Sequence, residues 1–209
     1  MRVLMIGNSL TYTNDLPGLL QQLSAGEYKP IVIDSVTSPM VSLRFHWNFT
    51  RARRTIANGH WDYVILQDFS RLPATNPERS IKYFSLFDEE IRRSGAKTIL
   101  FENWTRKAYQ DDYAPLLATY GKIREQTGAK IAPIGEVWHK FRAEHPEIAL
   151  LKDDRHPTAA GTYLAACVLY DVLYLKPSSA LPLTLGGPDL PAGEIQMLRA
   201  AADKMVIHE

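Results

Sequence analysis

The sequence predicts a three-layer α/β/α domain with about five parallel strands, and two observations carry that prediction. First, short apolar runs of strand length alternate along the chain with longer segments of helical periodicity. Second, each pair of runs is separated by a helix-length connection, which favours parallel pairing through right-handed crossovers with helices on both faces. The expected strands are residues 3–6, 30–34, 63–66, 97–101 and 130–132.

The expected helices have recognisable first and last turns. Pro17 and Pro157 suit a first helical turn, because a proline there removes no helical hydrogen bond. Gly95 and Gly128 follow apolar-periodic segments and predict helix ends. The expected helices are residues 16–23, 42–57, 77–93, 112–126, 157–173 and 194–206. Because no repeat or linker interrupts this pattern, we expect one domain over residues 1–209.

Composition excludes several classes of partner. The 24 Lys and Arg residues nearly balance 23 Asp and Glu residues, so no long-range field would gather nucleic acid, and we expect no nucleic-acid partner. No run approaches the roughly 18 apolar residues of a membrane span, so none is expected. Residues 2–7 are too short for a secretory signal, which predicts a cytoplasmic protein or an exported one whose signal has been removed. The single cysteine, Cys167, is expected in the core, and nothing in the sequence predicts the oligomeric state.

In open α/β sheets, ligands bind beyond the carboxyl ends of the strands. Ser9 lies directly after the first expected strand, in Gly7-Asn8-Ser9, where a glycine turn and a following helix could present its hydroxyl. A helix N-cap or a polar turn residue would explain the same serine. As a nucleophile, a serine hydroxyl needs a base to remove its proton, and the base needs a third group to orient it.

His156 is the strongest candidate base among six histidines, because it precedes a long helix in Asp153-Asp154-Arg155-His156-Pro157. The Asp153 carboxylate, three residues earlier, could reach the Nδ1 side of the ring. A surface loop or half of a metal site would give the same pattern. No second histidine or carboxylate cluster stands at ligand spacing, so no metal is expected. Gln67, after the third strand, could donate its amide to an oxyanion or bond only to the backbone.

Together these motifs resemble the SGNH (or GDSL-like) hydrolase superfamily. The resemblance runs from Gly7-Asn8-Ser9 through residues 153–157 to residues 161–166, where Gly-Thr-Tyr-Leu-Ala-Ala completes its most specific part. Residues 66–70, Leu-Gln-Asp-Phe-Ser, look like a variant in which glutamine replaces the usual oxyanion-hole asparagine. Residues 61–64 and 132–135 resemble a bacterial branch of the superfamily.

The resemblance implies a flavodoxin-like sheet and hydrolysis of esters without a cofactor. It implies Ser9 as nucleophile, His156 as base and Asp153 as the acid that orients the histidine, with Asp154 as the alternative acid. The Ser9 N–H and Gln67 would be oxyanion donors.

The sequence departs from the family pattern twice. Asn8 stands where the family usually has aspartate, and residues 37–43 contain no glycine to complete the oxyanion hole. Pro39 has no N–H, so we expect Met40 to supply the third donor.

The expected activity is hydrolysis of small acyl esters, acetyl esters foremost, through an acyl-enzyme. The substrate would be a small-molecule ester, with acylated sugars among the candidates. An acyltransferase with the same triad, or a catalytically weak carbohydrate-binding module, is the alternative. Trp104 would line the substrate pocket or pack in the core, and loops of ordinary length predict an open site for a short acyl chain.

Overall fold

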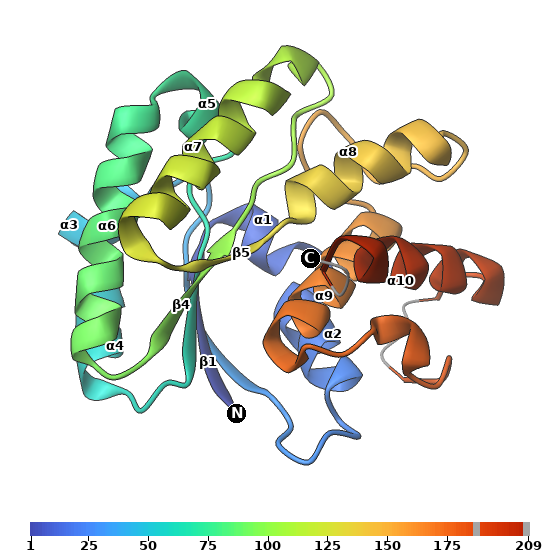
Figure 1. Ribbon diagram of the computed structural model, residues 1–209, viewed down its shortest axis with the longest axis horizontal. Helices are drawn as coiled ribbons and strands as arrows, with labels where there is room; N and C mark the ends of the chain where they lie inside the picture. Colours follow the sequence, from blue (N-terminus) through green and yellow to red (C-terminus); the bar gives the residue numbers. More distant parts are fainter. Residues whose placement is uncertain (186–188, 207–209) are drawn as a thin grey trace.

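The computed structural model describes residues 1–185 and 189–206, which build a five-stranded parallel sheet with helices on both faces (Figure 1). The strand order is β2-β1-β3-β4-β5, and every neighbouring pair is parallel. The predicted three-layer architecture is therefore confirmed. The strands are β1 (Arg2–Gly7), β2 (Val32–Thr37), β3 (Tyr63–Leu66), β4 (Lys97–Phe101) and β5 (Lys130–Ala132).

Alternate side chains of the buried strands feed two separate cores. In β1, Val3 and Met5 belong to one apolar cluster, while Leu4 and Ile6 belong to the other. This is the period of two that a strand imposes on its side chains. The first core is covered by α1 (Ser9–Tyr12), α2 (Leu16–Leu23), α8 (Ile134–Glu144), α9 (Ala159–Tyr174) and α10 (Ala192–Val206). The second is covered by α3 (Leu43–Phe49), α4 (Ala52–Asn58), α5 (Leu72–Thr75), α6 (Pro77–Arg93) and α7 (Tyr113–Thr127).

Three elements differ from the sequence-based expectation. The helix expected over residues 42–57 is two helices, α3 and α4, separated at Thr50, whose backbone is extended at φ −118° and ψ 176°. The Thr50 hydroxyl accepts from the Ala52 N–H at 3.1 Å, so a local side-chain bond replaces a helical one. The second strand begins two residues later and ends three residues later than predicted. Helix α8, with 11 residues, is absent from the helices expected from the sequence.

Short 3₁₀ turns complete the described chain at Thr13–Asp15, Gln110–Asp112 and Ser178–Ala180. Within the described ranges, no helix combines the length and apolar character needed to cross a membrane. Cys167 lies in α9 with no exposed surface, and burial raises the pKa of its thiol, so it is a core residue as predicted.

Candidate active site

The turn after β1 presents Ser9 at the start of α1. The Asn8 side chain caps this helix by accepting from the Leu10 N–H at 3.2 Å. Gly7 allows the turn, because a Cβ at this position would collide with the Thr11 hydroxyl and the Gln67 side chain. A tightly packed glycine turn therefore fixes the backbone that carries Ser9.

The loop before α9 presents His156. Leu151 and Pro157 form an isolated antiparallel bridge, and the Lys152 N–H donates to the His156 carbonyl at 3.0 Å. Thr158 then caps α9 by accepting from the Gly161 N–H at 3.1 Å. These bonds close residues 151–157 into a short turn, which holds His156 beside the carboxyl end of β1, where Ser9 lies.

The structure brings Ser9, His156 and Asp153 into one hydrogen-bonded chain. The Ser9 Oγ lies 3.2 Å from His156 Nε2, and His156 Nδ1 lies 2.8 Å from Asp153 Oδ2. A proton on Nδ1 satisfies the carboxylate and leaves Nε2 free to accept the serine hydroxyl proton. The arrangement can therefore raise the nucleophilicity of Ser9.

Asp153 is held in its ionised form. Its Oδ1 accepts the N–H groups of His156 at 2.7 Å and Arg155 at 2.8 Å. These bonds, led by the one from the His156 N–H, hold the pKa of Asp153 well below its usual range, with a further contribution from the His156 ring. Asp154, the alternative acid, instead pairs with Arg106 and accepts from the Ala108 N–H at 2.9 Å.

A second contact joins the two loops of the triad. Asn14, which follows α1, donates its amide to the Pro157 carbonyl at 3.1 Å and to the Thr162 hydroxyl at 2.9 Å. Its backbone is left-handed, with φ 53°, a conformation that asparagine tolerates better than most residues. The segment that follows Ser9 is thereby tied to the segment that follows His156.

Trp104 lies in the core rather than in the pocket. It is 2% exposed, stacks on Trp138 with ring centroids 4.1 Å apart, and donates its indole N–H to the Arg155 carbonyl at 3.0 Å. Of the two roles left open for this residue, core packing is the one the structure shows. The indole N–H bond also braces the backbone directly before His156.

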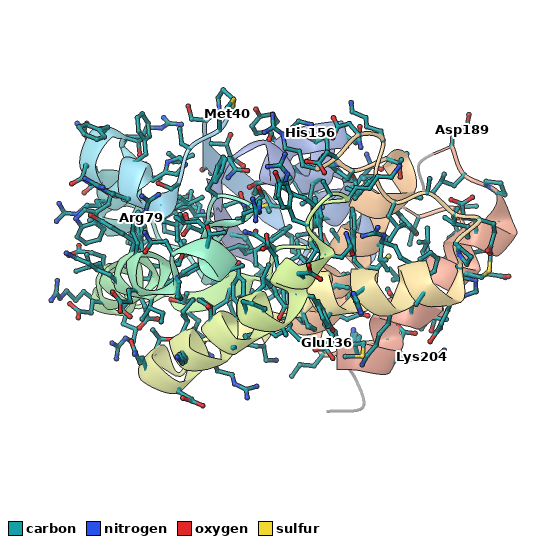
Figure 2. The ribbon with its side chains drawn as sticks, turned by 90° about the horizontal axis from the view of Figure 1, so that it is seen from above. Met40, Arg79, Glu136, His156, Asp189 and Lys204 are labelled. Atoms are coloured by element: carbon teal, nitrogen blue, oxygen red, sulfur yellow. The ribbon has the colours of Figure 1, made fainter. Side chains whose placement is uncertain are left out.

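A small hollow of about 10 Å³ opens beside Ser9, and it is lined by Asn8, Ser9, Leu10, Met40, Phe69, Ser70 and Arg155. Met40 and His156 lie along the same side of the molecule (Figure 2). The Met40 backbone is left-handed, with φ 58°, in the loop where a glycine is missing from the family pattern. Within the described ranges, the N–H groups of Ser9 and Met40 donate to no protein acceptor. Strained backbone of this kind is concentrated at functional sites.

Gln67 requires a correction, because its amide does not reach the hollow. The side chain is completely buried, and its amide hydrogens go to the Asp68 carbonyl and to Asn103 Oδ1, the latter at 3.1 Å. Its Oε1 accepts from the Asn8 N–H at 2.8 Å and the Thr11 hydroxyl at 3.0 Å. Gln67 therefore supports the turn that carries Ser9, which matches its backbone-bonded alternative.

Two residues that the sequence analysis did not assign hold the loops around the hollow. Asp68 Oδ1 accepts the N–H groups of Leu43 at 2.9 Å and Phe69 at 2.8 Å, and burial raises the pKa of its carboxyl. The Asn103 amide donates to the carbonyls of Asp68 at 3.0 Å and Ser70 at 3.2 Å. Both residues come soon after strands, in the segments where the strand-end rule places ligands, so position alone was the available signal.

His46 is a further supporting residue that the sequence did not single out. Its Nε2 lies 2.8 Å from the Gly7 carbonyl, and the ring has no exposed surface. Burial lowers the pKa of His46, so the neutral ring donates a hydrogen bond to the last carbonyl of β1. Among the described residues, no group of three or more His, Cys, Asp or Glu side chains could hold a metal ion.

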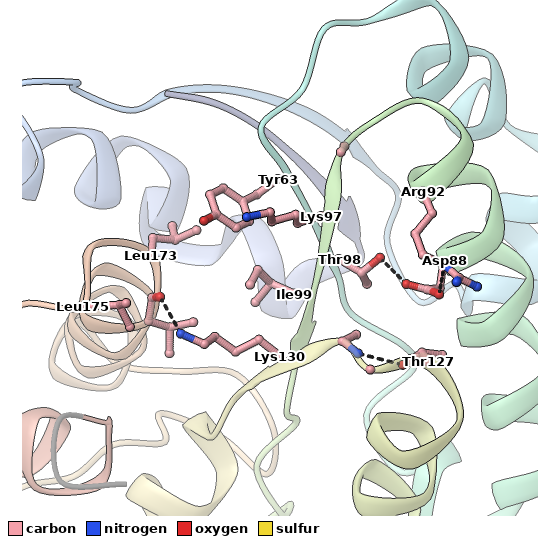
Figure 3. A pocket seen from close by; sticks show the side chains of 14 residues that line it. Tyr63, Asp88, Arg92, Lys97, Thr98, Ile99, Thr127, Lys130, Leu173 and Leu175 are labelled. Atoms are coloured by element: carbon pink, nitrogen blue, oxygen red, sulfur yellow. Dashed lines mark hydrogen bonds and ion pairs between the residues drawn. The ribbon is translucent and has the colours of Figure 1, made fainter.

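A larger hollow, of about 380 Å³, lies at the opposite end of the sheet, where β3, β4 and β5 begin (Figure 3). Its polar groups are largely paired: Asp88 accepts from Thr98 at 2.7 Å and lies 2.8 Å from Arg92, and Lys130 reaches the Val172 carbonyl at 3.5 Å. No described serine, histidine or cysteine lines it. It offers volume but no serine–histidine pair among its described lining residues.

Comparison with solved structures places the fold. A protein from Slackia heliotrinireducens, proposed to be an SGNH hydrolase, is 26% identical with a TM-score of 0.74, over 83% of this chain and 98% of that one. A DUF4886 family protein from Bacteroides uniformis is 18% identical with a TM-score of 0.81, over 100% of this chain and 95% of that one. The acetyl xylan esterase AlAXEase is 12% identical with a TM-score of 0.68, over 82% of this chain and 98% of that one. No family model and no curated protein sequence matches the chain.

The class that the comparisons define is therefore the three-layer α/β/α fold, which the chain shares with structures described as a hydrolase, esterases and a lipase. Within that class, the chain has the fold of the SGNH and GDSL-like hydrolases, which confirms the resemblance seen in the sequence.

Proposed function

We propose that this protein is a serine esterase that hydrolyses small acyl esters through an acyl-enzyme. The observation that carries the proposal is the chain of contacts from Ser9 Oγ through His156 to Asp153, at 3.2 Å and 2.8 Å. Its setting at the carboxyl ends of the strands supports the same conclusion. We propose likewise that residues 1–209 form one domain, since both helical layers pack on a single sheet.

The mechanism uses the three residues in sequence. His156 Nε2 takes the hydroxyl proton as Ser9 Oγ attacks the ester carbonyl carbon, and the carbonyl electron pair moves to oxygen. The Asp153 carboxylate stabilises the imidazolium that forms. The intermediate collapses, the alcohol leaves with the proton from His156, and the acyl group remains on Ser9. A water molecule, deprotonated by His156, then releases the acid.

The size of the hollow favours a short acyl group. Its volume of about 10 Å³ has room for roughly one water molecule, so a long acyl chain would find no enclosed channel beside Ser9. Among acyl groups, acetyl departs least from this limit, and the match to an acetyl xylan esterase makes acetylated carbohydrates the first natural candidates.

The test is hydrolysis of p-nitrophenyl acetate, butyrate and octanoate by the wild type, together with labelling by a p-nitrophenyl dialkyl phosphonate. We expect kcat/KM to fall from acetate to octanoate and the phosphonate to modify Ser9 alone, as located by peptide mass spectrometry. Absence of both turnover and labelling would refute the esterase. Faster acyl transfer to added methanol or sugar than to water would identify an acyltransferase.

A further inference from the structure

Ser70 carries the one polar side-chain atom of the Ser9 hollow that is buried and without a partner among the described residues. The residue is 5% exposed, and no described acceptor or donor lies within hydrogen-bonding distance of its Oγ. It nevertheless lines the same small hollow as Ser9 and Met40. Buried hydroxyls are normally hydrogen-bonded, so an isolated one beside a nucleophile requires an explanation.

The backbone around Ser70 is held in place. The Asn103 amide donates to the Ser70 carbonyl at 3.2 Å, and the Leu72 N–H donates to the Phe69 carbonyl at 2.8 Å. Asp68 fixes the Phe69 N–H from the other side, at 2.8 Å. The hydroxyl therefore sits on a prepared turn rather than on a loose one.

An ordinary structural role does not account for this hydroxyl. Helix capping is one such role, but the N-cap residue of α5 is Arg71, and this helix has no side-chain cap hydrogen bond. The Ser70 hydroxyl therefore supports neither the helix nor the turn through any described bond.

Apart from Ser9 itself, the other neutral side chains around the hollow have no free hydrogen-bond donor to offer a substrate, so Ser70 is the candidate. Gln67, the expected donor, uses both amide hydrogens elsewhere. The Asn8 amide donates to the Val41 carbonyl at 3.0 Å. Phe69, Leu10 and Met40 have no polar hydrogen on their side chains.

We propose that Ser70 is a catalytic residue of this site, whose hydroxyl donates a hydrogen bond to the oxyanion of the tetrahedral intermediate. This inference rests on the proposed esterase function. The Ser70 O–H keeps its proton throughout, because the negative charge forms on the former carbonyl oxygen and returns to the carbon when the alcohol leaves. The N–H groups of Ser9 and Met40 are the other donors, so the set consists of two backbone groups and one hydroxyl.

Because the Ser70 hydroxyl has no partner in the free protein, its hydrogen bond to the oxyanion should stabilise the intermediate more strongly. A hydroxyl that must break a protein hydrogen bond before meeting the oxyanion loses part of its stabilising effect. The Ser70 Oγ has almost no accessible surface in the free protein, so the side chain must turn toward the developing charge, but it breaks no protein hydrogen bond when it does so.

The test compares Ser70→Ala with Ser94→Ala, using p-nitrophenyl acetate kinetics and thermal unfolding. Ser94 is the matched control because its hydroxyl already donates to the Ile91 carbonyl at 2.7 Å, away from the site. Losing one oxyanion donor should lower kcat about 10²–10³-fold with little change in KM. Because the removed hydroxyl has no partner, the Tm of Ser70→Ala should equal or exceed that of the wild type. Ser94→Ala should keep the wild-type kcat.

A transition-state readout separates this role from a structural one. The affinity of a trifluoromethyl ketone, which forms an oxyanion on Ser9, should fall in Ser70→Ala by about the same factor as kcat/KM. Ser70→Cys, a near-isosteric change to a weaker donor, should lie between serine and alanine, and it serves if the alanine variant folds poorly.

The outcomes distinguish this inference from the proposed function. Wild-type kcat and ketone affinity in Ser70→Ala, with activity abolished in Ser9→Ala, would overturn the role of Ser70 and leave the esterase intact. A fall in Tm that accounts for the lost activity would also overturn it. An inactive wild type whose Ser9 resists the phosphonate would overturn both.

Discussion

The two ends of the sheet contrast in size and in chemistry. The hollow where the strands begin measures about 380 Å³, and its carboxylate and lysine groups are mostly paired. The hollow beside Ser9, past the end of β1, measures about 10 Å³, yet Ser9, Met40 and Ser70 each bring it a donor without a protein partner. Volume therefore does not mark the site in this protein. The proposed site is distinguished instead by the chain of contacts from Ser9 through His156 to Asp153 and by the donors beside Ser9 that have no protein partner.

The largest expected effect on kcat is the difference between a variant at Ser9 and a variant in the larger hollow. Ser9→Ala removes the nucleophile and should lower kcat for p-nitrophenyl acetate by about 10⁴-fold or more. The double change Lys97→Ala and Lys130→Ala, in the larger hollow, should leave kcat within about twofold, because neither lysine lies near the triad. A loss of activity in the lysine variant comparable to that in Ser9→Ala would reverse the assignment of the two hollows.

The next largest expected effect on kcat distinguishes the roles of the adjacent carboxylates of Asp153 and Asp154. Asp153→Asn removes the acceptor that holds the His156 tautomer and should lower kcat by about 10²–10⁴-fold. Asp154→Asn is the matched control, since Asp154 pairs with Arg106, and its kcat should change by less than about threefold. Equal losses in both variants, measured under identical conditions, would contradict the choice of Asp153.

The same variant tests the state of Asp153 through pH. Its pKa is lowered in the folded protein, so the stabilisation that ionised Asp153 provides is present above its unfolded pKa of about 3.9. That stabilisation is lost as the pH falls through the lowered folded pKa. The Tm difference between wild type and Asp153→Asn should therefore be largest near neutral pH and shrink under acid. A difference that grows under acid would show that Asp153 is not ionised in the fold.

A smaller effect concerns Asn8, which stands where the family usually has aspartate. Its amide donates to the Val41 carbonyl at 3.0 Å, so Asn8→Asp would place a carboxylate against a carbonyl oxygen in a buried site. We expect a loss of about 1–3 kcal/mol, seen as a fall of several degrees in Tm. Asn48→Asp is the control, because Asn48 makes its bond to the Arg44 carbonyl in the open, and its Tm should stay within about 1 °C.

The smallest effect compares one left-handed residue from each hollow. Met40 at φ 58° and Leu175 at φ 54° both adopt a conformation that costs a side chain about 1–2 kcal/mol. Replacing either residue with glycine removes this cost, but the greater conformational freedom of glycine in the unfolded chain offsets part of the stabilisation. Met40→Gly and Leu175→Gly should therefore each raise Tm by about 1–3 °C. Met40→Gly keeps the backbone N–H and should retain activity. Loss of activity in Met40→Gly would show that the methionine side chain itself acts on the substrate.

Sequence reasoning was most successful where a periodic pattern or a tight motif carries the information. All five strands could be located, because most are short apolar runs closed by glycine or polar residues, although β2 is displaced by two to three residues. Asp153 and His156 could be paired because three residues separate them within one turn. That Ser9 lies beside them followed from the strand-end rule together with the resemblance.

The rest depends on contacts between segments that are distant in sequence. Gln67 looked like a donor because its position was right, but its amide direction is set by Asn103, 36 residues later. The isolation of the Ser70 hydroxyl is equally invisible in sequence, since it depends on what the folded neighbours fail to offer. The break between α3 and α4 depends on one hydrogen bond to the Thr50 hydroxyl, which helix propensities do not take into account.

The bond from Asn14 to Pro157 has a consequence for the order of events during synthesis. Ser9 and His156 are 147 positions apart, and α9, buried from Ala160 to Leu173, must dock against α2 before Asn14 can bridge them. A ribosome-bound chain that exposes Ser9 first would therefore remain inert until the later segment emerges and the long-range contacts close. Esterase activity would then report completed folding, and a refolding time course followed by ester turnover would record the last step of assembly.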